Sequence, residues 1–529
     1  MSNHAEVIAE TLAGLGVNYV FGLPGGELSA FVDACRRNGL RFLLTGHETS
    51  AAMMAQVLGQ ITGIPGVCAA TLGPGATNLV TGVANAFLDR APLLALTAQI
   101  PQAQIQTMSH QRLDLHALFA SITKRSATVG DGDTAELVRE SFALAAAPLP
   151  GPVHLSLPSD VAVETFSPKK HTGKPDSPVR QESTPSSLKE IAASIAASTR
   201  PLVLVGLHTP PAAASDVRAF VNKLGAPFLV TPKAKGILSE GSPLFLGVAS
   251  GMAIDGDILE TIRMADVVVG IGFDPVECDK TWFSEIKIVS VCSAPMAEGD
   301  YRPIEAVGEI SSLVNHLTSF IREPRPWPED VLAERRKAIT RPAGLSQDGV
   351  SPLALVEAFR AIFPRNGITT CDVGAHKMLS GQFWRTYEPG TFFMSNGLSA
   401  MGFGIPAAVA AQLAYPDRAV MTIVGDGGML MMAHDLALIR ELNLPIIIVC
   451  LADGSLSIIQ VSQERRGFIP YGVNFQPPSF AAMAEAFGIR GQKATTLKDA
   501  KAAFERALEE RRSMLLEVHV NRSEYYDLM

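Results

Sequence analysis

One pattern constrains the fold of this chain more than any other: an apolar, strand-like run that ends in an acidic turn containing glycine. The run over 419–424 ends in Gly-Asp-Gly-Gly at 425–428 and leads into a helix-forming segment over 431–442. A second run, over 444–451, ends in Ala-Asp-Gly-Ser at 452–455. Runs of this kind, joined by helices, predict a parallel sheet, and open parallel sheets bind ligands beyond the carboxyl ends of their strands.

The two turns are suited to binding a phosphate group together with a metal ion. Glycines allow the backbone to approach a diphosphate, and the start of the following helix offers unpaired N–H groups. The carboxylates of Asp426 and Asp453 are oxygen donors of the kind that a hard divalent cation prefers. The sequence therefore predicts that these two residues share a divalent cation with phosphate oxygens.

The domain organisation follows from length and from two polar stretches. A chain of 529 residues has room for about three domains. Proline-bearing segments over 164–188 and 323–351 are typical of linkers. We expect an α/β protein with three doubly wound parallel-sheet domains, over residues 1–163, 189–322 and 351–529.

Charge and hydropathy argue against several classes of function. The net charge of −8 and the pI near 5.8 disfavour nucleic acid or an anionic membrane surface as a partner. No apolar run approaches the ~20 residues of a membrane span, and the amino terminus lacks the pattern of a signal peptide. The six scattered cysteines suit neither a disulfide framework nor a zinc site. We expect reduced, buried thiols at Cys68, Cys371 and Cys450 in a cytoplasmic enzyme.

The amino-terminal segment contains three further strand–turn–helix patterns. The run that starts at Tyr19 leads into Gly-Leu-Pro-Gly-Gly at 22–26, and the run over 41–44 is soon followed by Glu48 at the start of a helix. The run over 66–72 ends in Gly-Pro-Gly-Ala-Thr-Asn at 73–78. A glutamate at a helix amino terminus is also common for electrostatic reasons alone, so the role of Glu48 depends on the other motifs.

Together these motifs resemble those of thiamine diphosphate (ThDP) enzymes, whose metal signature is Gly-Asp-Gly followed by Asn-Asn. Here Ala-Asp at 452–453 replaces Asn-Asn. The resemblance implies that Glu48 is the catalytic glutamate, which protonates N1′ of the cofactor's pyrimidine. It implies Mg²⁺ ligands at Asp426, Asp453 and Ser455. It also implies cofactor contacts at Gly22, Gly25, Gly374, Ala375, His376, Ser399, Met401, Gly425, Gly427 and Gly428.

Softer motifs resemble those of the catabolic acetolactate synthases. They are the Gly-Phe-Asp-Pro-Val-Glu segment at 272–277 with Trp282, and the carboxyl-terminal stretch that begins at Gln463. Decarboxylases of the pyruvate and benzoylformate type typically place histidines near the thiazolium, but the turn at 73–75 has none. Gln111 stands where carboligating relatives have a glutamine that faces the substrate. It is the candidate for holding a 2-oxo acid carboxylate or the acceptor, although a structural role in its loop is an open alternative.

The central segment is not expected to bind FAD. The run over 201–205 ends in Gly-Leu-His-Thr-Pro-Pro at 206–211, which lacks a Gly-x-Gly turn, and its two prolines remove N–H donors. The anabolic acetohydroxyacid synthases, which carry FAD in this domain, also have a tryptophan in a region without aromatic residues here, 457–464.

The resemblance implies a ThDP- and Mg²⁺-dependent enzyme that decarboxylates a small 2-oxo acid, with pyruvate expected, and joins the product to an acceptor. It implies a homodimer or homotetramer, with Glu48 from one subunit and Asp426, Asp453 and Met401 from another. Two alternatives stay open. One is a decarboxylase or synthase for another 2-oxo acid or an acyl acceptor, because His-Gln-x-x-Asp at 110–114 also resembles carboxyethylarginine synthase. The other is a ThDP-binding protein without turnover.

Overall fold

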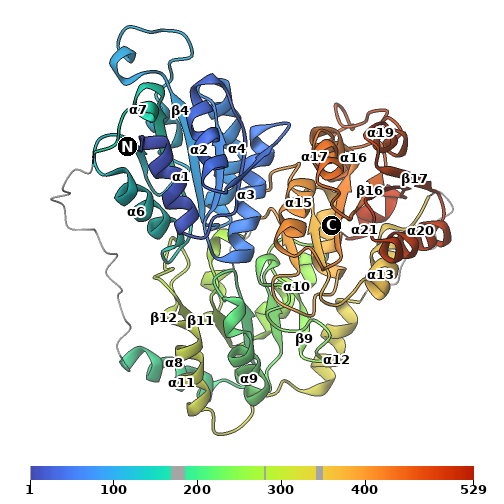
Figure 1. Cartoon of the computed structure of the whole chain (residues 1–529). Helices are drawn as coiled ribbons and strands as arrows, with labels where there is room; N and C mark the ends of the chain where they lie inside the picture. The colour runs from blue at the N-terminus through green and yellow to red at the C-terminus, as the bar shows by residue number, and fades with distance from the viewer. Residues whose placement is uncertain (1, 168–184, 279–281, 341–348, 529) are drawn as a thin grey trace. The chain divides into compact units, whose positions relative to one another are not determined.

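The computed structural model describes residues 2–167, 185–278, 282–340 and 349–528 (Figure 1). Three six-stranded sheets follow one another along the chain, and every strand pair in them is parallel. Helices connect the strands and flank each sheet. The predicted fold class, α/β with three doubly wound parallel sheets, is therefore confirmed.

The first sheet has the strand order β2-β1-β3-β4-β6-β5. Its strands are β1 (Tyr19–Leu23), β2 (Arg41–Leu44), β3 (Gly66–Ala70), β4 (Leu93–Gln99), β5 (Ser126–Thr128) and β6 (Pro152–Pro158). Its helices are α1 (His4–Gly14), α2 (Ser29–Arg37), α3 (Glu48–Thr62), α4 (Pro74–Leu88), α5 (Leu115–Phe119), α6 (Thr134–Ala146) and α7 (Ser159–Val163). Strands β3 and β4 are buried along their whole length, as expected for strands covered on both faces.

The second sheet has the order β12-β11-β10-β7-β8-β9. Its strands are β7 (Pro201–Val205), β8 (Phe228–Val230), β9 (Phe245–Val248), β10 (Val267–Ile271), β11 (Lys287–Cys292) and β12 (Ile304–Val307). The helices along this part of the chain are α8 (Pro185–Ala197), α9 (Ala214–Leu224), α10 (Asp255–Met264), α11 (Ile310–Phe320) and α12 (Glu329–Ala338). The strand order reverses between β7 and β10, which is the point where a dinucleotide binds in sheets of this order.

The third sheet, β14-β13-β15-β16-β18-β17, repeats the strand order of the first. Its strands are β13 (Ile368–Cys371), β14 (Phe392–Met394), β15 (Val420–Gly425), β16 (Ile446–Ala452), β17 (Arg490–Ala494) and β18 (Met514–His519). The helices here are α13 (Pro352–Ile362), α14 (Ala375–Phe383), α15 (Gly404–Ala414), α16 (Asp426–Met431), α17 (Asp435–Glu441), α18 (Ser457–Arg465), α19 (Phe480–Ala486), α20 (Leu497–Glu510) and α21 (Tyr525–Leu528).

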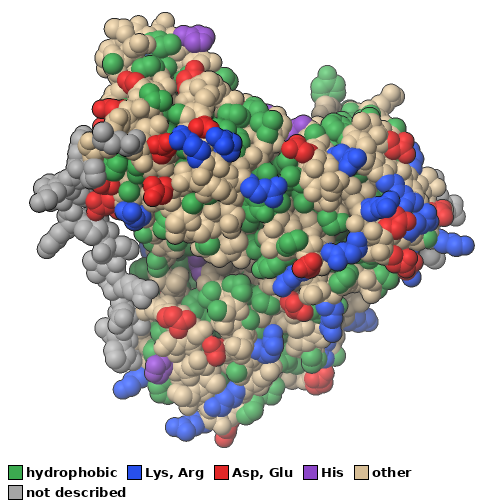
Figure 2. Space-filling view, viewed as in Figure 1, with side chains coloured by type: hydrophobic (Ala, Val, Ile, Leu, Met, Phe, Trp, Pro, Cys, Tyr) green, Lys and Arg blue, Asp and Glu red, His purple; other side chains and the backbone are tan. Residues whose placement is uncertain are grey.

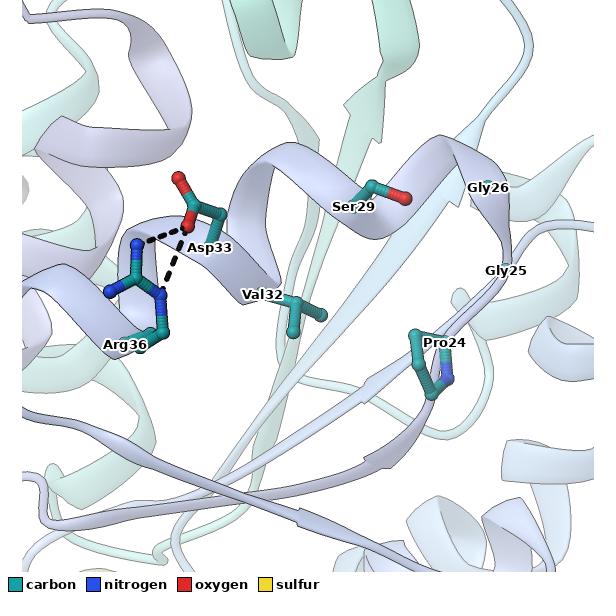
Figure 3. A pocket seen from close by; sticks show the side chains of 7 residues that line it. All are labelled: Pro24, Gly25, Gly26, Ser29, Val32, Asp33 and Arg36. Carbon is teal, nitrogen blue, oxygen red and sulfur yellow. Dashed lines mark hydrogen bonds and ion pairs between the residues drawn. The ribbon is translucent and has the colours of Figure 1, made fainter.

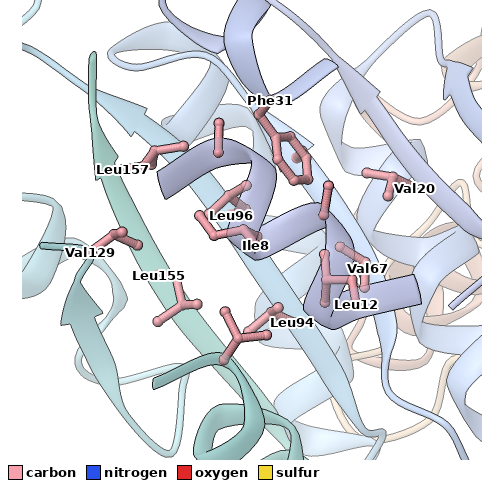
Figure 4. Packing of buried hydrophobic residues seen from close by; sticks show 14 of the residues in the cluster. Ile8, Leu12, Val20, Phe31, Val67, Leu94, Leu96, Val129, Leu155 and Leu157 are labelled. Atoms are coloured by element: carbon pink, nitrogen blue, oxygen red, sulfur yellow. The ribbon is translucent and has the colours of Figure 1, made fainter. Parts of the chain in front are cut away.

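The core of the first sheet shows how one helix is fixed to the strands. Asn3 caps α1, because its side chain accepts the N–H of Glu6 (2.9 Å) while the Glu6 carboxylate accepts the N–H of Asn3 (2.9 Å). Beyond this capping box, Ile8 and Leu12 of α1 belong to one buried cluster with Leu94 and Leu96 of β4 and with the leucines of β6 (Figure 4). The capping box and the apolar face together hold α1 over the sheet.

Packing divides the chain into two compact units. The first consists of Met1–Pro178, Gly397–Asp417 and Leu430–Leu444, and so holds the first sheet together with α15 and α17. The second consists of Val179–Asn396, Arg418–Met429 and Pro445–Met529, and holds the other two sheets. The domain boundaries expected from the linker sequences stay predictions.

The structure departs from the sequence predictions at one helix. The sequence predicts one helix over 431–442, but the structure has two. Helix α16 begins directly at the end of β15 and ends at Met431, and α17 begins at Asp435 after a short non-helical stretch. Parts of both predicted linkers, 168–184 and 341–348, lie outside the described residues.

Other sequence expectations can be compared directly with the described residues. Cys68, Cys371 and Cys450 are buried, and no disulfide joins any of the six cysteines, all of which lie in described segments. None of the described helices has the length and apolar character that a membrane crossing requires. Acidic and basic side chains are interspersed on the face shown in Figure 2.

Candidate cofactor and metal site

Strands β15 and β16 bring two carboxyl groups together in the second unit. The strands are paired in parallel up to Gly425, so the residues that follow them leave the sheet at the same edge. Asp426, the first residue of α16, is only 3% exposed. Its carboxylate accepts three backbone N–H groups, those of Gly427 (2.8 Å), Gly454 (2.7 Å) and Asp453 (3.1 Å). These bonds fix Asp426 against the turn that follows β16.

Asp453 is the second carboxyl group of this turn. Its two oxygens accept the N–H of Ser455 (3.0 Å) and the hydroxyl of Ser457 (2.6 Å). Burial, and after it the charge of Asp453, raises the pKa of Asp426 to about 6, and burial also raises the pKa of Asp453. A carboxyl group whose ionisation is opposed by burial and by a neighbouring carboxylate, as that of Asp426 is, would be stabilised as an anion by a nearby cation. The pair therefore fits the predicted divalent ion.

The ligand groups of this turn are oxygen atoms, which suit Mg²⁺ better than a softer metal. Ser455, the third predicted ligand, donates its hydroxyl to Oε1 of Gln460 (2.9 Å). Among the described residues, no group of three or more His, Cys, Asp or Glu side chains could hold a metal ion. An ion bound at Asp426 and Asp453 would therefore complete its shell with other oxygens, such as those of a diphosphate.

His376 lies between the glycine turns of β13 and β15. A Cβ atom added to Gly374 would stand 2.6 Å from Cε1 of His376, and one added to Gly425 would stand 2.8 Å from the same atom. The ring is buried, and burial lowers its pKa to about 4, so the imidazole is neutral. Its Nε2 is a buried atom without a hydrogen-bond partner in the described part of the chain. The structure thus places His376 at the strand ends and away from the surface.

Gly425 and Gly428 of the turn at 425–428 both stand close to neighbouring side chains. A Cβ atom at Gly428 would stand 2.4 Å from Oδ2 of Asp372, the residue that follows β13. Gly427 donates its N–H to Asp426, and Ala375 is the first residue of α14. The predicted contact residues Gly374, Ala375, His376, Gly425, Gly427 and Gly428 thus gather at the carboxyl ends of β13 and β15, where the strand order of the sheet reverses.

In the first unit, Glu48 begins α3 just beyond the end of β2. The side chain is 3% exposed, and its Oε2 accepts the side-chain N–H of Asn78 (2.9 Å). Thr49 donates its hydroxyl to the carbonyl of Asn78 (2.7 Å), which joins the start of α3 to α4 a second time. A Cβ atom at Gly75 would stand 3.2 Å from Oε1 of Glu48. The carboxyl group is therefore held against the glycine turn that follows β3.

Gln111 stands over the same glycine turn. A Cβ atom at Gly73 would lie 3.0 Å from Cβ of Gln111. Gln111 is exposed and has φ of 55°, in the left-handed region that residues other than glycine seldom adopt. The turn at 73–75 therefore has Glu48 near Gly75 and Gln111 near Gly73, so the structure brings both predicted catalytic side chains to the end of β3.

Gly22 lies within the neighbouring strand, β1, and Gly25 follows it. A Cβ atom at Gly22 would stand 2.2 Å from the carbonyl oxygen of Ala69 in β3, and one at Gly25 would stand 2.3 Å from Oγ1 of Thr71. Close packing alone accounts for both glycines. Beside Gly25, an open pocket of about 540 Å³ is lined by the turn over 24–26 and by α2, and Figure 3 shows Arg36 of α2 paired with Asp33 (2.8 Å).

Ser399 and Met401 lie on the segment that precedes α15, in the first unit. Ser399 is exposed with φ of 54°, and Met401 is half-buried. The segment is anchored because Gly397 donates its N–H to Oδ1 of Asp89 (2.9 Å), and α15 packs against α3. Asp89, which follows α4, thus holds the segment that carries Ser399 and Met401.

Sequence reasoning named the strand-end motifs but missed two groups around them. Asn78 is the last residue of the motif at 73–78, yet nothing in the sequence pairs it with Glu48. Ser50, His434 and Asp435 form a cluster at the start of α3 (Ser50 Oγ to Asp435 Oδ2, 2.9 Å). No sequence signal links these residues, because 385 positions separate Ser50 from Asp435.

Comparison with known proteins identifies the three domains of the chain. Three family models match, described as the N-terminal TPP binding domain, the central domain and the C-terminal TPP binding domain of thiamine pyrophosphate enzymes, over residues 2–118, 188–317 and 372–518. The chain is 30% identical to an acetolactate synthase of Bacillus subtilis, over 99% of this chain and 94% of that protein.

Two further relatives show the same range of similarity. A probable acetolactate synthase large subunit of Methanocaldococcus jannaschii is 31% identical over 98% of this chain and 92% of its own. A catabolic acetolactate synthase of Raoultella terrigena is 30% identical over 92% and 89%. Because the similarity covers nearly the whole of both chains and all three domains match, this chain belongs to the thiamine pyrophosphate enzyme family.

Proposed function

We propose that this protein uses ThDP and Mg²⁺ to decarboxylate a small 2-oxo acid, pyruvate first of all, and joins the retained fragment to an acceptor, as an acetolactate synthase does. The observation that carries the proposal is a pair of strand-end sites. One is the buried Glu48 with its amide partner Asn78, in the N-terminal TPP-binding domain. The other is the coupled pair Asp426 and Asp453, in the C-terminal one.

The roles of the side chains follow from their surroundings. ThDP, when bound, would supply a nucleophilic thiazolium carbon and a sink for the electron pair that decarboxylation leaves. Glu48 holds and moves a proton at N1′ of the pyrimidine, and Asn78 keeps its second oxygen aligned. Asp426 and Asp453, with Ser455, would hold Mg²⁺, which would neutralise the charge of the cofactor's diphosphate.

The other predicted contacts position the cofactor. The glycine turns at 22–25, 374 and 425–428 let the backbone come close, and the neutral His376 has a nitrogen available for a hydrogen bond. We assign the carbonyl of Ser399 to the cofactor's amine and Met401 to the bend between its two rings.

Gln111 is proposed to bind the substrate carboxylate or the acceptor through its amide. Its left-handed backbone conformation is costly for a residue other than glycine, and such strain is typical of binding and catalytic loops. Its side chain stands above the glycine turn that also borders Glu48. A substrate held by Gln111 would therefore lie near the group that handles the proton.

We infer that the central domain takes no FAD. At the turn between the sheet's halves, the Glu277 carboxylate accepts the N–H groups of Leu207 (3.0 Å) and Lys233 (3.2 Å). Asp274 lies 2.8 Å from Nε2 of His208 in the same place. Dinucleotide phosphates need free N–H donors at this point and are repelled by carboxylates. Purified protein should accordingly show no flavin absorbance.

The minimum active unit is proposed to be a homodimer, with Glu48 from one subunit and the metal turn from the other, in the cytoplasm. Both features rest on the resemblance to the family. The enzyme is proposed to need no nucleic acid or membrane partner.

Product analysis tests the function. The protein would be incubated with ThDP, Mg²⁺ and single 2-oxo acids, and products identified by mass spectrometry, with Glu48→Gln as the control. We expect CO₂ and acetolactate from pyruvate, and a rate about 10²–10⁴ lower for Glu48→Gln, the usual effect of losing a general acid or base. Turnover only with a larger 2-oxo acid or an acyl acceptor would assign the protein to another branch of the family. Cofactor binding without any CO₂ release would contradict an enzymatic role.

A further inference from the structure

The buried face at the start of α3 is held by a segment from far along the chain. Ser50, two residues after Glu48, is fully buried. Its hydroxyl donates to Oδ2 of Asp435 (2.9 Å) and lies 3.1 Å from Nε2 of His434. Both partners belong to Leu430–Leu444, which packs within the first unit. The contact therefore ties α17 to the first turn of α3.

His434 also fixes the residues that precede Glu48. A Cβ atom at Gly46 would stand 2.6 Å from Cδ2 of His434, so the imidazole lies directly against the backbone there. The next residue, His47, caps α3 by accepting the N–H of Thr49 on Nδ1 (3.1 Å). The contacts at Gly46 and Ser50 flank Glu48 on both sides in the chain.

Burying the carboxyl group of Asp435 in this position costs free energy. Its side chain is fully buried, and burial raises its pKa to about 7, with the Ser50 hydroxyl acting in the opposite direction. The nearest basic group is His434, whose Nε2 is 3.5 Å from Oδ1 and whose own pKa is lowered by burial and by His47. A purely packing role would be served by an apolar residue without this cost.

We propose that Asp435, together with Ser50 and His434, positions Glu48 by fixing the first turn of α3. Asn78 of α4 aligns the Glu48 carboxyl group. Asp435, the first residue of α17, fixes the backbone of α3 at Glu48 through its bond to Ser50. The inference rests on the proposed proton-transfer role of Glu48. In this arrangement Asp435 does not touch the cofactor, and its effect on the reaction runs entirely through Glu48.

The test compares Ser50→Ala, Asp435→Ala and Asp435→Asn, since asparagine keeps an oxygen that can accept from Ser50. Asp133→Ala is the matched control, because Asp133 caps α6 in the same unit by accepting the N–H of Glu136 (2.9 Å). In protein without cofactor, amide hydrogen exchange over 47–51 should be faster in both alanine variants and unchanged in Asp133→Ala. With ThDP and Mg²⁺ bound, exchange of the cofactor's C2 proton should slow about tenfold in both, as for one lost hydrogen bond. In Asp435→Asn, exchange of the C2 proton should be faster than in Asp435→Ala and close to that of the native protein.

A double variant separates positioning from general damage. In a Glu48→Gln background, Asp435→Ala should cause no further loss, because there is no carboxyl group left to position. An equal loss in both backgrounds would overturn the inference, and so would an unchanged rate in Ser50→Ala while Glu48→Gln is slow. A normal rate in Glu48→Gln itself would instead contradict the proposed function.

Discussion

At the scale of single residues, the chain places several buried carboxyl groups in the turns that follow its strands. Asp426 and Asp453 follow two strands of the third sheet, and Glu277 lies in the turn after a strand of the second. Asp426 and Glu277 are buried, Asp453 is partly buried, and desolvation raises the pKa of each. A carboxyl group kept in such a place needs a cation, a set of N–H donors or a proton. Which of the three it has decides its role.

The metal turn gives the first prediction. Asp426→Ala should weaken Mg²⁺-dependent ThDP binding by more than about 100-fold, because it removes an anionic ligand from a desolvated site. Asp453→Asn should cost less than about tenfold, because the amide keeps an oxygen ligand and Ser457 can accept from its N–H group. Calorimetric titration with ThDP, with and without Mg²⁺, measures both. Equal damage by the two substitutions would mean that Asp453 is wrongly assigned.

Glu277 gives a prediction about pH. Burial raises its pKa to about 7, above the usual value of 4.5, so folding favours its protonated form. Its contribution to stability is full below pH 4.5 and is lost as the pH rises through 7. Relative to Glu277→Gln, the native protein should lose about 1–3 kcal/mol of stability between pH 5 and pH 8. Titratable groups that the native protein and Glu277→Gln share affect both proteins equally. The difference between their melting temperatures should therefore shrink or change sign as the pH rises. A constant gap would contradict an uncharged Glu277 at low pH.

At the scale of elements, each site is a strand followed by a glycine turn and a helix. In the first sheet the close approach of β1 to β3 requires Gly22, and in the third sheet the start of α14 brings His376 against Gly425. Some of these glycines therefore serve the packing of the elements, whatever they do for a ligand. Stability measured without cofactor distinguishes the two roles.

Gly22→Ala is predicted to destabilise the protein even without ThDP. The added Cβ atom would meet the backbone oxygen of Ala69 at 2.2 Å, and overpacking of this kind costs about 1–3 kcal/mol. Gly26→Ala is the matched control, because nothing lies within 4 Å of its added Cβ atom. Thermal unfolding of the protein without cofactor should show a lower melting temperature for the first variant only. Equal melting temperatures would indicate that β1 moves to accommodate the methyl group.

At the scale of the whole molecule, the first and third sheets share one strand order although the sequence shows no short internal repeat. The two TPP-binding domains lie at the two ends of the chain, with the central domain between them. The proposed function needs residues of both domains, and these could come from one chain or from two copies.

Mixing two inactive proteins distinguishes these arrangements. Glu48→Gln and Asp426→Ala are each expected to be inactive alone. If the site combines Glu48 of one subunit with Asp426 of the other, a hybrid dimer has one site with both residues intact. Random pairing should then restore about a quarter of the native rate. Co-expression with two affinity tags isolates the hybrid for assay. A hybrid without activity would place Glu48 and Asp426 of one site in the same subunit.

Much of the architecture could be predicted from the sequence because it depends on local pattern. Apolar runs that end in glycine and aspartate predict parallel strands and mark their carboxyl ends, and β15 and β16 lie within about two residues of the predicted runs. The position of Glu48 at the start of a helix was readable in the same way. The break before α17 was not, because a helical pattern continues across it.

The sequence by itself determined the class of fold, the strand-end turns and the acidic residues in them, since each depends on neighbours in the chain. Only the tertiary structure decided which distant groups meet. Asn78 reaches Glu48, His376 is buried against Gly425, and Asp435 bonds to Ser50 across 385 positions. Apolar and polar patterns specify which side of a helix is buried, but they do not specify which distant residues that side contacts. That choice is made by packing the whole chain at once.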